Sequence, residues 1–303
     1  MARAFRVAAA QYPIEAVASI DAYEAKIASW IENAHSVGAA LAVFPEYGIM
    51  ELAAAFPAVK SDLRGSIEAI DRHIGEIDAL HKTLARKHDM HILAASAPLR
   101  GEDGRFRNVA RLFTPGGAVG RQEKLVMTRF EREEWGIAGG STINVFKTRL
   151  GMIGVSICYD AEFPLIARAQ TLAGAELILT PSATDTLAGY WRVRIGAQAR
   201  ALENQCYVVH APTVGEAAWS PAMDDNRGAA GIYGPPDIGF PDDGVVAIGE
   251  IDRPAWVLGE VDLDRVSAVR LDGRVLNSLH WPEQVGTDAP PLIEPTAEII
   301  DLT

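Results

Sequence analysis

Short apolar segments alternate with longer amphipathic segments along most of this chain. Residues 5–11, 41–44 and 91–97 are apolar runs of strand length. Residues 19–38 and 67–88 instead place apolar side chains at intervals of three and four, which is the spacing of one face of an α-helix. Short buried strands that alternate with amphipathic helices pack as layers, with the helices covering the sheets. The sequence therefore predicts an α/β fold.

The same alternation continues through the second half of the chain. Further strands are predicted at residues 152–158, 177–180, 207–210, 245–248 and 256–261, the last two as a pair. Further helices are predicted at residues 164–172 and 191–204. A hairpin is predicted at residues 110–122, turning at Thr114-Pro-Gly-Gly117. Hairpins give antiparallel pairs and helical crossovers give parallel pairs, so we expect mixed sheets. We expect one domain, residues 1–287, and a proline-rich C-terminal tail, residues 288–303, that wraps over a surface or a neighbouring subunit.

Charge and cysteine content narrow the possible partners and compartment. The chain has 40 acidic and 28 basic residues and a formal net charge of −12, whereas binding to nucleic acid or to an anionic membrane needs a basic face. No apolar run approaches the roughly 20 residues that cross a bilayer. The first apolar run ends at Gln11, too soon for a signal peptide, so it is predicted to be the first strand. With two cysteines, Cys158 and Cys206, no disulfide framework is expected, and the cytoplasm is the expected location.

Three apolar segments end in a residue that can take part in catalysis. Glu46 follows Ala42-Val-Phe-Pro, Lys124 follows Gly120-Arg-Gln-Glu, and Cys158 follows Gly154-Val-Ser-Ile. Strand ends are where functional groups converge in layered α/β folds, because the scaffold fixes the backbone there while the loops stay open to solvent. Taken singly, each residue has a simpler explanation: the cysteine as a small core residue, the glutamate and the lysine as surface charges.

Other reactive residues are interpreted as structural. His210 follows an apolar segment and is expected to be a hydrogen-bonded core histidine; a Cys158–His210 protease dyad would leave Glu46 and Lys124 without a role. Cys206, at the entrance of a predicted strand, is expected to be inert. Arg200 and Glu203 lie three positions apart on a predicted helix and are expected to form an ion pair. Glycine-rich nucleotide-binding motifs and the G-x-S-x-G motif are absent from the sequence.

The order and the surroundings of the three strand-end residues resemble the nitrilase (carbon–nitrogen hydrolase) superfamily, in its amidase-like branch. The resemblance rests on Phe44-Pro-Glu46, on Lys124 at the end of a hairpin strand and on Cys158-Tyr-Asp-Ala-Glu-Phe-Pro164, and it covers roughly residues 5–265. It implies a four-layer α-β-β-α sandwich with two central mixed sheets. It also implies a homodimer or higher homo-oligomer, whose contact surface would be the helices near residues 163–172 and 191–204. No metal and no organic cofactor is implied.

The resemblance further implies a Glu–Lys–Cys triad that hydrolyses an amide. Cys158 would be the nucleophile, and Glu46 would accept its proton and deliver it to the leaving amine. Lys124, with the backbone N–H of Tyr159, would stabilise the oxyanion, and its charge would lower the pKa of the thiol. Burial must raise the pKa of Glu46 for this proton shuttle to work.

A second active-site glutamate and several substrate contacts are implied as well. The glutamate is assigned to Glu131, seven positions after Lys124, with Glu133 as the alternative; acids in this run are otherwise typical of a solvated helix start. The side chains expected at the rim of the pocket, which are equally suited to packing, are Tyr47, Tyr159, Glu162, Thr184 and Trp191. Residues 125–129 and 230–240 depart from the common pattern of the superfamily, so the resemblance does not define the substrate.

We therefore expect a hydrolase that cleaves the carbon–nitrogen bond of a small linear amide or carbamoyl compound through a cysteine thioester and releases ammonia or an amine. One alternative is a nitrilase that converts a nitrile to an acid and ammonia. Another is a non-catalytic oligomeric binding protein that retains the fold. Alkylation of Cys158 faster than that of a model thiol would favour the enzyme over the binding protein.

Overall fold

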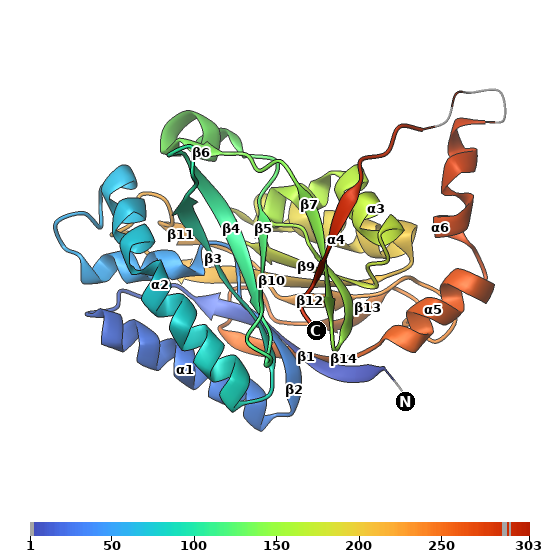
Figure 1. Cartoon of the computed structure of the whole chain (residues 1–303), viewed down its shortest axis with the longest axis horizontal. Helices are drawn as coiled ribbons and strands as arrows, with labels where there is room; N and C mark the ends of the chain where they lie inside the picture. Colours follow the sequence, from blue (N-terminus) through green and yellow to red (C-terminus); the bar gives the residue numbers. More distant parts are fainter. Residues whose placement is uncertain (1–2, 287–289, 291) are drawn as a thin grey trace.

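Two mixed β-sheets lie face to face in the computed structural model of the chain, which describes residues 3–286, 290 and 292–303 (Figure 1). The first sheet has the strand order β14 (Ala255–Asp262), β1 (Ala4–Pro13), β2 (Ala39–Val43), β3 (His91–Arg100), β4 (Phe106–Phe113) and β5 (Val119–Glu123), with the short β6 (Ile137–Ala138) beside β4. The second has the order β15 (Ala297–Asp301), β7 (Ile143–Thr148), β8 (Gly151–Val155), β9 (Leu177–Ser182), β10 (Tyr207–Glu216), β12 (Gly231–Tyr233) and β13 (Val245–Ile248).

A short parallel ladder joins the two sheets. Tyr12 and Pro13, at the end of β1, are in register with Thr213 and Val214 of β10. Beyond this point β10 also pairs with the two-residue strand β11 (Asp225–Asn226). The two sheets are therefore continuous where the end of β1 meets β10, close to the loops that follow several strands.

The central strands, such as β1, β2, β3 and β9, are largely buried on both faces, which explains their mostly apolar sequences. In β1, Val7 and Ala9 belong to the cluster between the two sheets, whereas Ala8 and Ala10 belong to the cluster beneath the helices of the first sheet. Successive side chains of a strand point to opposite faces, so a strand covered on both sides needs an apolar residue at every position. The same alternation holds in the second sheet, where Leu177 faces the first sheet and Ile178 faces the outer helices.

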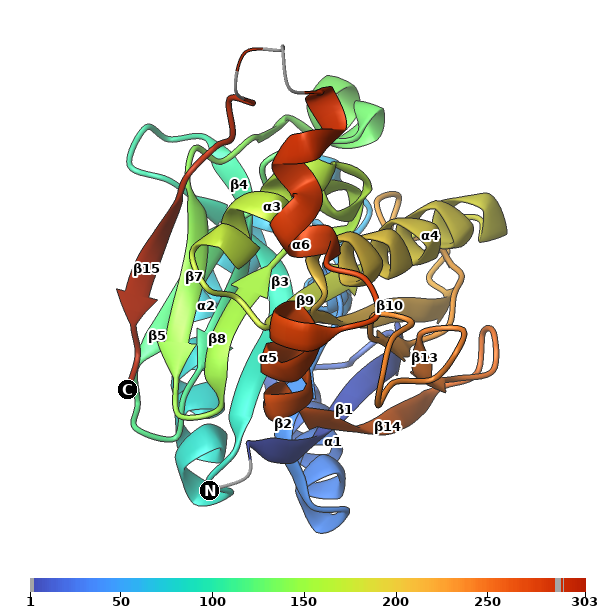
Figure 2. The ribbon, with the colours of Figure 1, turned by 90° about the vertical axis from the view of Figure 1, so that its right-hand side faces the viewer.

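Helices cover the outer faces of both sheets (Figure 2). Helices α1 (Ile20–Ser36) and α2 (Leu63–Lys87) pack on the first sheet, and α3 (Pro164–Leu172) and α4 (Leu187–Asn204) pack on the second. The side chains of Ser19, Asp62 and Thr186 accept hydrogen bonds from the first turns of α1, α2 and α4, which fixes where these helices begin. The result is the four-layer α-β-β-α sandwich that was predicted. Two further helices, α5 (Leu263–Asp272) and α6 (Asn277–His280), follow β14.

Two sequence-based expectations need correction. The strand predicted at residues 152–158 ends at Val155, and Cys158 instead opens the short 3-10 helix η3 (Cys158–Glu162). The last two predicted strands are present, but β13 pairs with β12 and β14 pairs with β1, so they lie in different sheets. Strand β7 and helix α5 were not predicted.

The C-terminal residues return to the edge of the second sheet. Glu294 accepts a hydrogen bond of 2.9 Å from Arg168 of α3, and β15 then pairs in parallel with β7 (Figure 2). The predicted boundary between domain and tail, at residues 287 and 288, lies outside the described residues. Within the described part of the chain, no helix combines the length and the apolarity needed to span a membrane.

Candidate active site

The three strand-end residues singled out in the sequence meet at one cavity of about 870 Å³. Glu46 follows β2, Lys124 follows β5, and Cys158 opens η3 after β8. The first two come from the first sheet and the third from the second sheet. The cavity therefore lies where loops from both halves of the sandwich meet, and all three residues line it.

Lys124 bridges two carboxylates inside the protein. Its Nζ lies 2.8 Å from Oε1 of Glu46 and 2.7 Å from Oε2 of Glu131, and its side chain is 1% exposed. Burial by itself lowers the pKa of Lys124, but the attraction of Glu131 and Glu46 outweighs burial and raises the pKa well above its usual value. The lysine is therefore a fixed positive charge at neutral pH.

Both carboxylate oxygens of Glu46 are held by hydrogen-bond donors. Oε1 accepts from Asn108 Nδ2 at 2.9 Å as well as from Lys124, and Oε2 accepts from the backbone N–H of Ala183 at 2.9 Å. Burial raises the pKa of Glu46 above its ordinary value, although Lys124 acts in the opposite direction. The direction agrees with the requirement that a proton shuttle places on this residue.

Cys158 has a backbone conformation that directs its thiol into the cavity. Its φ of 50° lies in the left-handed region, which is uncommon for a residue with a side chain. The side chain is buried, and Sγ lies 3.7 Å from the carbonyl oxygen of Ala183. Lys124 lowers the pKa of the thiol, as expected, but burial, followed by the charge of Glu46, outweighs the lysine, and the net effect raises the pKa of Cys158 well above its ordinary value. Burial therefore favours the neutral thiol in the free protein.

The structure places Glu131, rather than Glu133, against the lysine. Glu131 belongs to the single π-helical turn η2 (Glu131–Trp135), and it also accepts hydrogen bonds from Tyr47 Oη at 2.8 Å and from the backbone N–H and Oγ1 of Thr128, both at 2.9 Å. Burial raises its pKa, but the charge of Lys124 and the hydrogen bonds from Lys124, Thr128 and Tyr47 together outweigh burial, and the net shift is downward. Glu133 pairs at 3.0 Å with the exposed side chain of Arg129 at the rim.

Four of the five expected pocket residues line the cavity, namely Tyr47, Tyr159, Glu162 and Thr184. Glu162 pairs with Arg192 at 3.4 Å, and Thr184 Oγ1 donates to the carbonyl of Arg227 at 2.8 Å. Trp191 is not among the lining residues, and the expectation for it is wrong: it is 44% exposed. Neighbouring residues on a helix differ in direction by about 100°, so α4 directs Arg192 to the cavity and Trp191 to the outer surface.

The residues that were interpreted as structural have structural contacts. His210 lies 2.7 Å from Ser182 Oγ through Nε2, and burial lowers its pKa to about 3. Arg200 pairs with Glu203 at 2.7 Å, as predicted. Cys206 is fully buried, and burial raises its pKa to about 12. Across the part of the chain that the structure describes, no three or more His, Cys, Asp or Glu side chains gather as a metal site would need.

Sequence reasoning did not assign three of the residues whose contacts organise this site. Asn108 supplies a donor to Glu46, and Ala183 supplies a backbone donor to Glu46 and a backbone acceptor to Cys158. Asp160, within the Cys158–Pro164 motif, accepts from the backbone that follows Lys124. Asn108 and Asp160 are polar residues near the motifs and could have been considered. Ala183 gives no signal, because every residue offers a backbone N–H and C=O.

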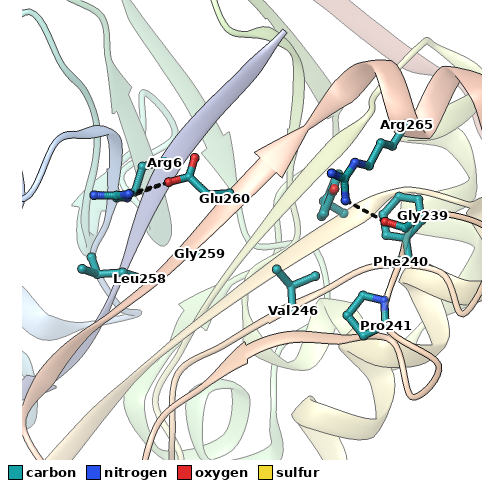
Figure 3. Close-up of a pocket in the computed structure, with 10 residues that line it drawn as sticks. Arg6, Gly239, Phe240, Pro241, Val246, Leu258, Gly259, Glu260 and Arg265 are labelled. Atoms are coloured by element: carbon teal, nitrogen blue, oxygen red, sulfur yellow. Dashed lines mark hydrogen bonds and ion pairs between the residues drawn. The ribbon is translucent and has the colours of Figure 1, made fainter. Parts of the chain in front are cut away.

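A second hollow, of about 640 Å³, lies away from this site near the edges of β13 and β14 (Figure 3). Its charged side chains already have partners: Arg6 pairs with Glu260 at 2.7 Å, and Arg265 donates to the carbonyl of Gly239 at 2.7 Å. The residues that line it include no cysteine, serine or threonine. The chemistry-bearing cavity is therefore the one that contains Cys158.

Comparison with known proteins shows which family the chain resembles. The carbon–nitrogen hydrolase family model matches residues 6–249. The chain is 34% identical over 270 residues to the probable hydrolase YhcX of Bacillus subtilis, covering 89% of this chain and 52% of that protein, so it spans about half of that relative's length. It is 29% identical over 203 residues to a deaminated glutathione amidase of Synechocystis sp., covering 62% of this chain and 70% of that protein.

A solved structure supports the fold. The carbon–nitrogen hydrolase from Helicobacter pylori G27 superposes with a TM-score of 0.72 at 19% identity, covering 94% of this chain and 96% of that one. The family match extends over most of the chain and includes the three strand ends that form the site. The chain belongs to the nitrilase superfamily of carbon–nitrogen hydrolases.

Proposed function

We propose that this protein is an amidase that hydrolyses a small linear amide or carbamoyl compound through a thioester on Cys158. The observation that carries the proposal is the buried ammonium of Lys124, which contacts Glu46 and Glu131 at 2.8 and 2.7 Å in the cavity that Cys158 also lines. A buried cation held between two carboxylates is costly to maintain. It is the arrangement needed to stabilise negative charge as it develops on a carbonyl oxygen.

The first half of the reaction forms the thioester. Sγ of Cys158 attacks the amide carbon, and the thiol proton passes to Glu46. The oxyanion is stabilised by Nζ of Lys124 and by the backbone N–H of Tyr159, which lines the same cavity. The carbon–nitrogen bond then breaks as Glu46 returns the proton to the departing nitrogen, and ammonia or an amine leaves.

The second half hydrolyses the thioester. Glu46 takes a proton from a water molecule, whose oxygen attacks the thioester carbon. A second oxyanion forms at the same donors and collapses, the acid is released, and Glu46 returns the proton to the sulfur of Cys158. In each half of the reaction Glu46 first accepts a proton and then returns it. This fits a carboxyl group whose pKa burial raises from its ordinary value.

The raised pKa of Cys158 determines when the nucleophile forms. Burial and the neighbouring charge of Glu46 hold the thiol protonated in the free protein. Deprotonation must therefore accompany attack on the substrate, with the proton moving to Glu46 as the sulfur–carbon bond forms. An activated thiolate waiting in the empty site is not part of this mechanism.

A substrate panel tests the proposal. Purified protein is incubated with linear amides, carbamoyl compounds and aliphatic nitriles, and ammonia release is measured against Cys158→Ala under the same conditions. We expect turnover of at least one amide or carbamoyl compound that depends on Cys158. Turnover of nitriles alone would replace the amidase with the nitrilase alternative, and no turnover of any compound would favour the binding protein that retains the fold.

Assembly of two or more copies through the outer helices of the second sheet is part of the proposal. Exposed apolar side chains gather on α3 and α4, namely Leu165, Leu172, Leu187, Trp191, Ile195 and Leu202. Ile195, at 62% exposure, lies near the middle of α4. Ile195→Asp should shift the sedimentation coefficient towards a monomer, and a native protein that already sediments as a monomer would contradict the assembly. A cytoplasmic location and the lack of a cofactor stay predictions.

A further inference from the structure

Asp160 is a buried carboxylate that the proposed reaction does not use. It is 1% exposed and lies in η3, two residues after Cys158. Its Oδ1 accepts a hydrogen bond of 2.8 Å from the backbone N–H of Val126, and its two oxygens share the N–H of Leu125 at 3.2 and 3.1 Å. The carboxylate therefore connects the segment of the cysteine to another segment of the chain through two backbone amides.

Those two amides immediately follow Lys124. The backbone of Lys124 is itself fixed, because its N–H donates to the carbonyl of Asn108 at 2.8 Å and its carbonyl accepts from Gly140 at 2.8 Å. Asn108 and Gly140 hold the lysine to the first sheet and its neighbouring loop. Asp160 then ties the next two residues to the segment that follows the second sheet and carries Cys158.

We propose that Asp160 is a positioning residue that sets the distance between the ammonium of Lys124 and the thiol of Cys158. The proposal deepens the amidase mechanism and rests on it for the effect on turnover. The lysine and the cysteine come from different sheets, so no single strand fixes their separation. A short, rigid carboxylate that joins the two loops can fix this separation.

The surroundings of Asp160 disfavour its charged form. Burial raises its pKa to about 7, opposed by the charge of Lys124 and by the two backbone N–H groups, while Glu46 adds to the rise. A folded-state pKa above the ordinary value means that ionising this group costs stability as pH rises towards 7. The ionised form nevertheless accepts hydrogen bonds more strongly than a neutral group, so the two backbone N–H groups offset part of this cost.

Two substitutions separate the effect of the hydrogen bonds that Asp160 accepts from the effect of its negative charge. Asp160→Asn removes the charge but keeps one oxygen that can accept from Val126, whereas Asp160→Ala removes every acceptor. Asp237 offers a matched control, because it accepts from the backbone N–H of Ile238 at 2.7 Å and of Arg274 at 2.9 Å and does not line the catalytic cavity. Asp237→Ala therefore breaks a similar link in a different part of the molecule.

The first measurement tests the hydrogen bonds between Asp160 and the segment after Lys124 and does not depend on enzyme turnover. Hydrogen exchange, followed by mass spectrometry on peptides that cover residues 124–128, should be at least ~10-fold faster in Asp160→Ala than in the native protein, and intermediate in Asp160→Asn. Asp237→Ala should leave these peptides unchanged. Equal protection in the native protein and Asp160→Ala would overturn the proposal. If Asp160→Ala does not fold, the comparison of Asp160→Asn with the native protein decides.

The second measurement reads the position of the lysine relative to the thiol. Iodoacetamide alkylation of Cys158 is followed against pH in a Cys206→Ser background. Both Asp160 variants lack the charge, so a higher apparent thiol pKa in Asp160→Ala than in Asp160→Asn reports that Lys124 has moved away from the sulfur. Identical alkylation profiles in the two variants would contradict the positioning role.

The third measurement connects positioning to catalysis, with the amide that the native protein hydrolyses fastest. We expect kcat to fall about 100-fold in Asp160→Ala, with KM changed much less, because small displacements of catalytic groups have effects of this size. Asp160→Asn should resemble the native protein at low pH, where the native Asp160 is protonated, and fall below it above about pH 7. Unchanged kcat together with faster exchange would overturn the positioning role. Absence of native turnover, with both earlier measurements as expected, would instead count against the amidase.

Discussion

The two cysteines of this protein share most of their local properties and differ in what surrounds them. Both are buried and free, each Sγ lies 3.7 Å from a backbone carbonyl oxygen, and burial raises the pKa of both thiols. Cys158 lines the cavity of about 870 Å³, whereas Cys206 lines neither this cavity nor the second hollow. Burial and a raised pKa therefore do not by themselves identify a nucleophile.

Nearby charge does not separate the two cysteines either. Cys206 has Arg200, Glu203 and Arg270 within electrostatic range. The first two pair with each other at 2.7 Å, and Arg270 donates to the carbonyls of Asn204, Gln205 and Ala175. These charged groups therefore pair with each other or donate hydrogen bonds to backbone carbonyls. At Cys158 the charged groups face a space that a substrate can enter, and this difference is what the proposed chemistry requires.

Replacing each cysteine in turn should give the largest contrast. Cys158→Ala should reduce kcat by roughly 10⁵- to 10⁶-fold, because a covalent mechanism has no substitute for its nucleophile. Cys206→Ala should change kcat less than two-fold and lower the free energy of unfolding by about 1 kcal/mol. Amide turnover and urea unfolding of both variants provide the measurement. Comparable losses of activity in the two variants would remove the distinction between the cysteines.

Removing the buried cation beside each cysteine should give the next largest contrast. Lys124→Met should lower kcat by about 10³-fold, because a donor to the oxyanion is lost. It should also lower the free energy of unfolding by about 3–5 kcal/mol, because Glu46 and Glu131 lose their shared partner. Arg200→Met, which breaks the ion pair near Cys206, should reduce stability but leave kcat of the folded fraction unchanged. Native-like turnover by folded Lys124→Met would exclude the triad.

Glu131 and Glu133, which both lie in η2, should respond differently to neutralisation. Glu131→Gln should reduce kcat by about 10- to 100-fold, since it weakens a buried charge-assisted hydrogen bond to Lys124. Glu133→Gln should stay within two-fold of the native protein, because its pairing with Arg129 is exposed to solvent. Steady-state kinetics of both variants decide between them, and a larger loss in Glu133→Gln would reverse the assignment.

Alkylation should show the smallest difference between the cysteines. Because both thiol pKa values are raised, both should react with iodoacetamide at pH 7 more slowly than glutathione, and both rates should rise with pH above the range of a free thiol. Cys158 should still react faster than Cys206, because it is reached through the cavity. Slow labelling at neutral pH is therefore compatible with an enzyme, contrary to the expectation from the sequence. Labelling of Cys206 before Cys158 would contradict the access argument.

Residues close together in the sequence were predicted well, and contacts between distant segments were not. Helix α3 was predicted with its observed bounds, and the hairpin of β4 and β5 was recognised by its turn. The direction of Trp191 was wrong because a helix that borders a cavity directs only one of its faces there. The strand that was predicted to run to Cys158 ends at Val155. The prediction was too long because apolar periodicity gives no signal of the left-handed conformation of Cys158.

The sequence alone determined the layered fold, since apolar periods of two and of three to four residues dictate which faces are buried. The resemblance of the motifs at three strand ends to the superfamily also singled out the residues that we propose as the acid, the ammonium and the sulfur of the reaction. Only the tertiary structure decided that Glu131 rather than Glu133 meets Lys124, that Ala183 contacts Glu46 while Asp160 contacts the backbone after Lys124, and that burial raises the pKa of the thiol. These outcomes depend on distances between chain segments and on burial from water, which no local pattern of residues encodes.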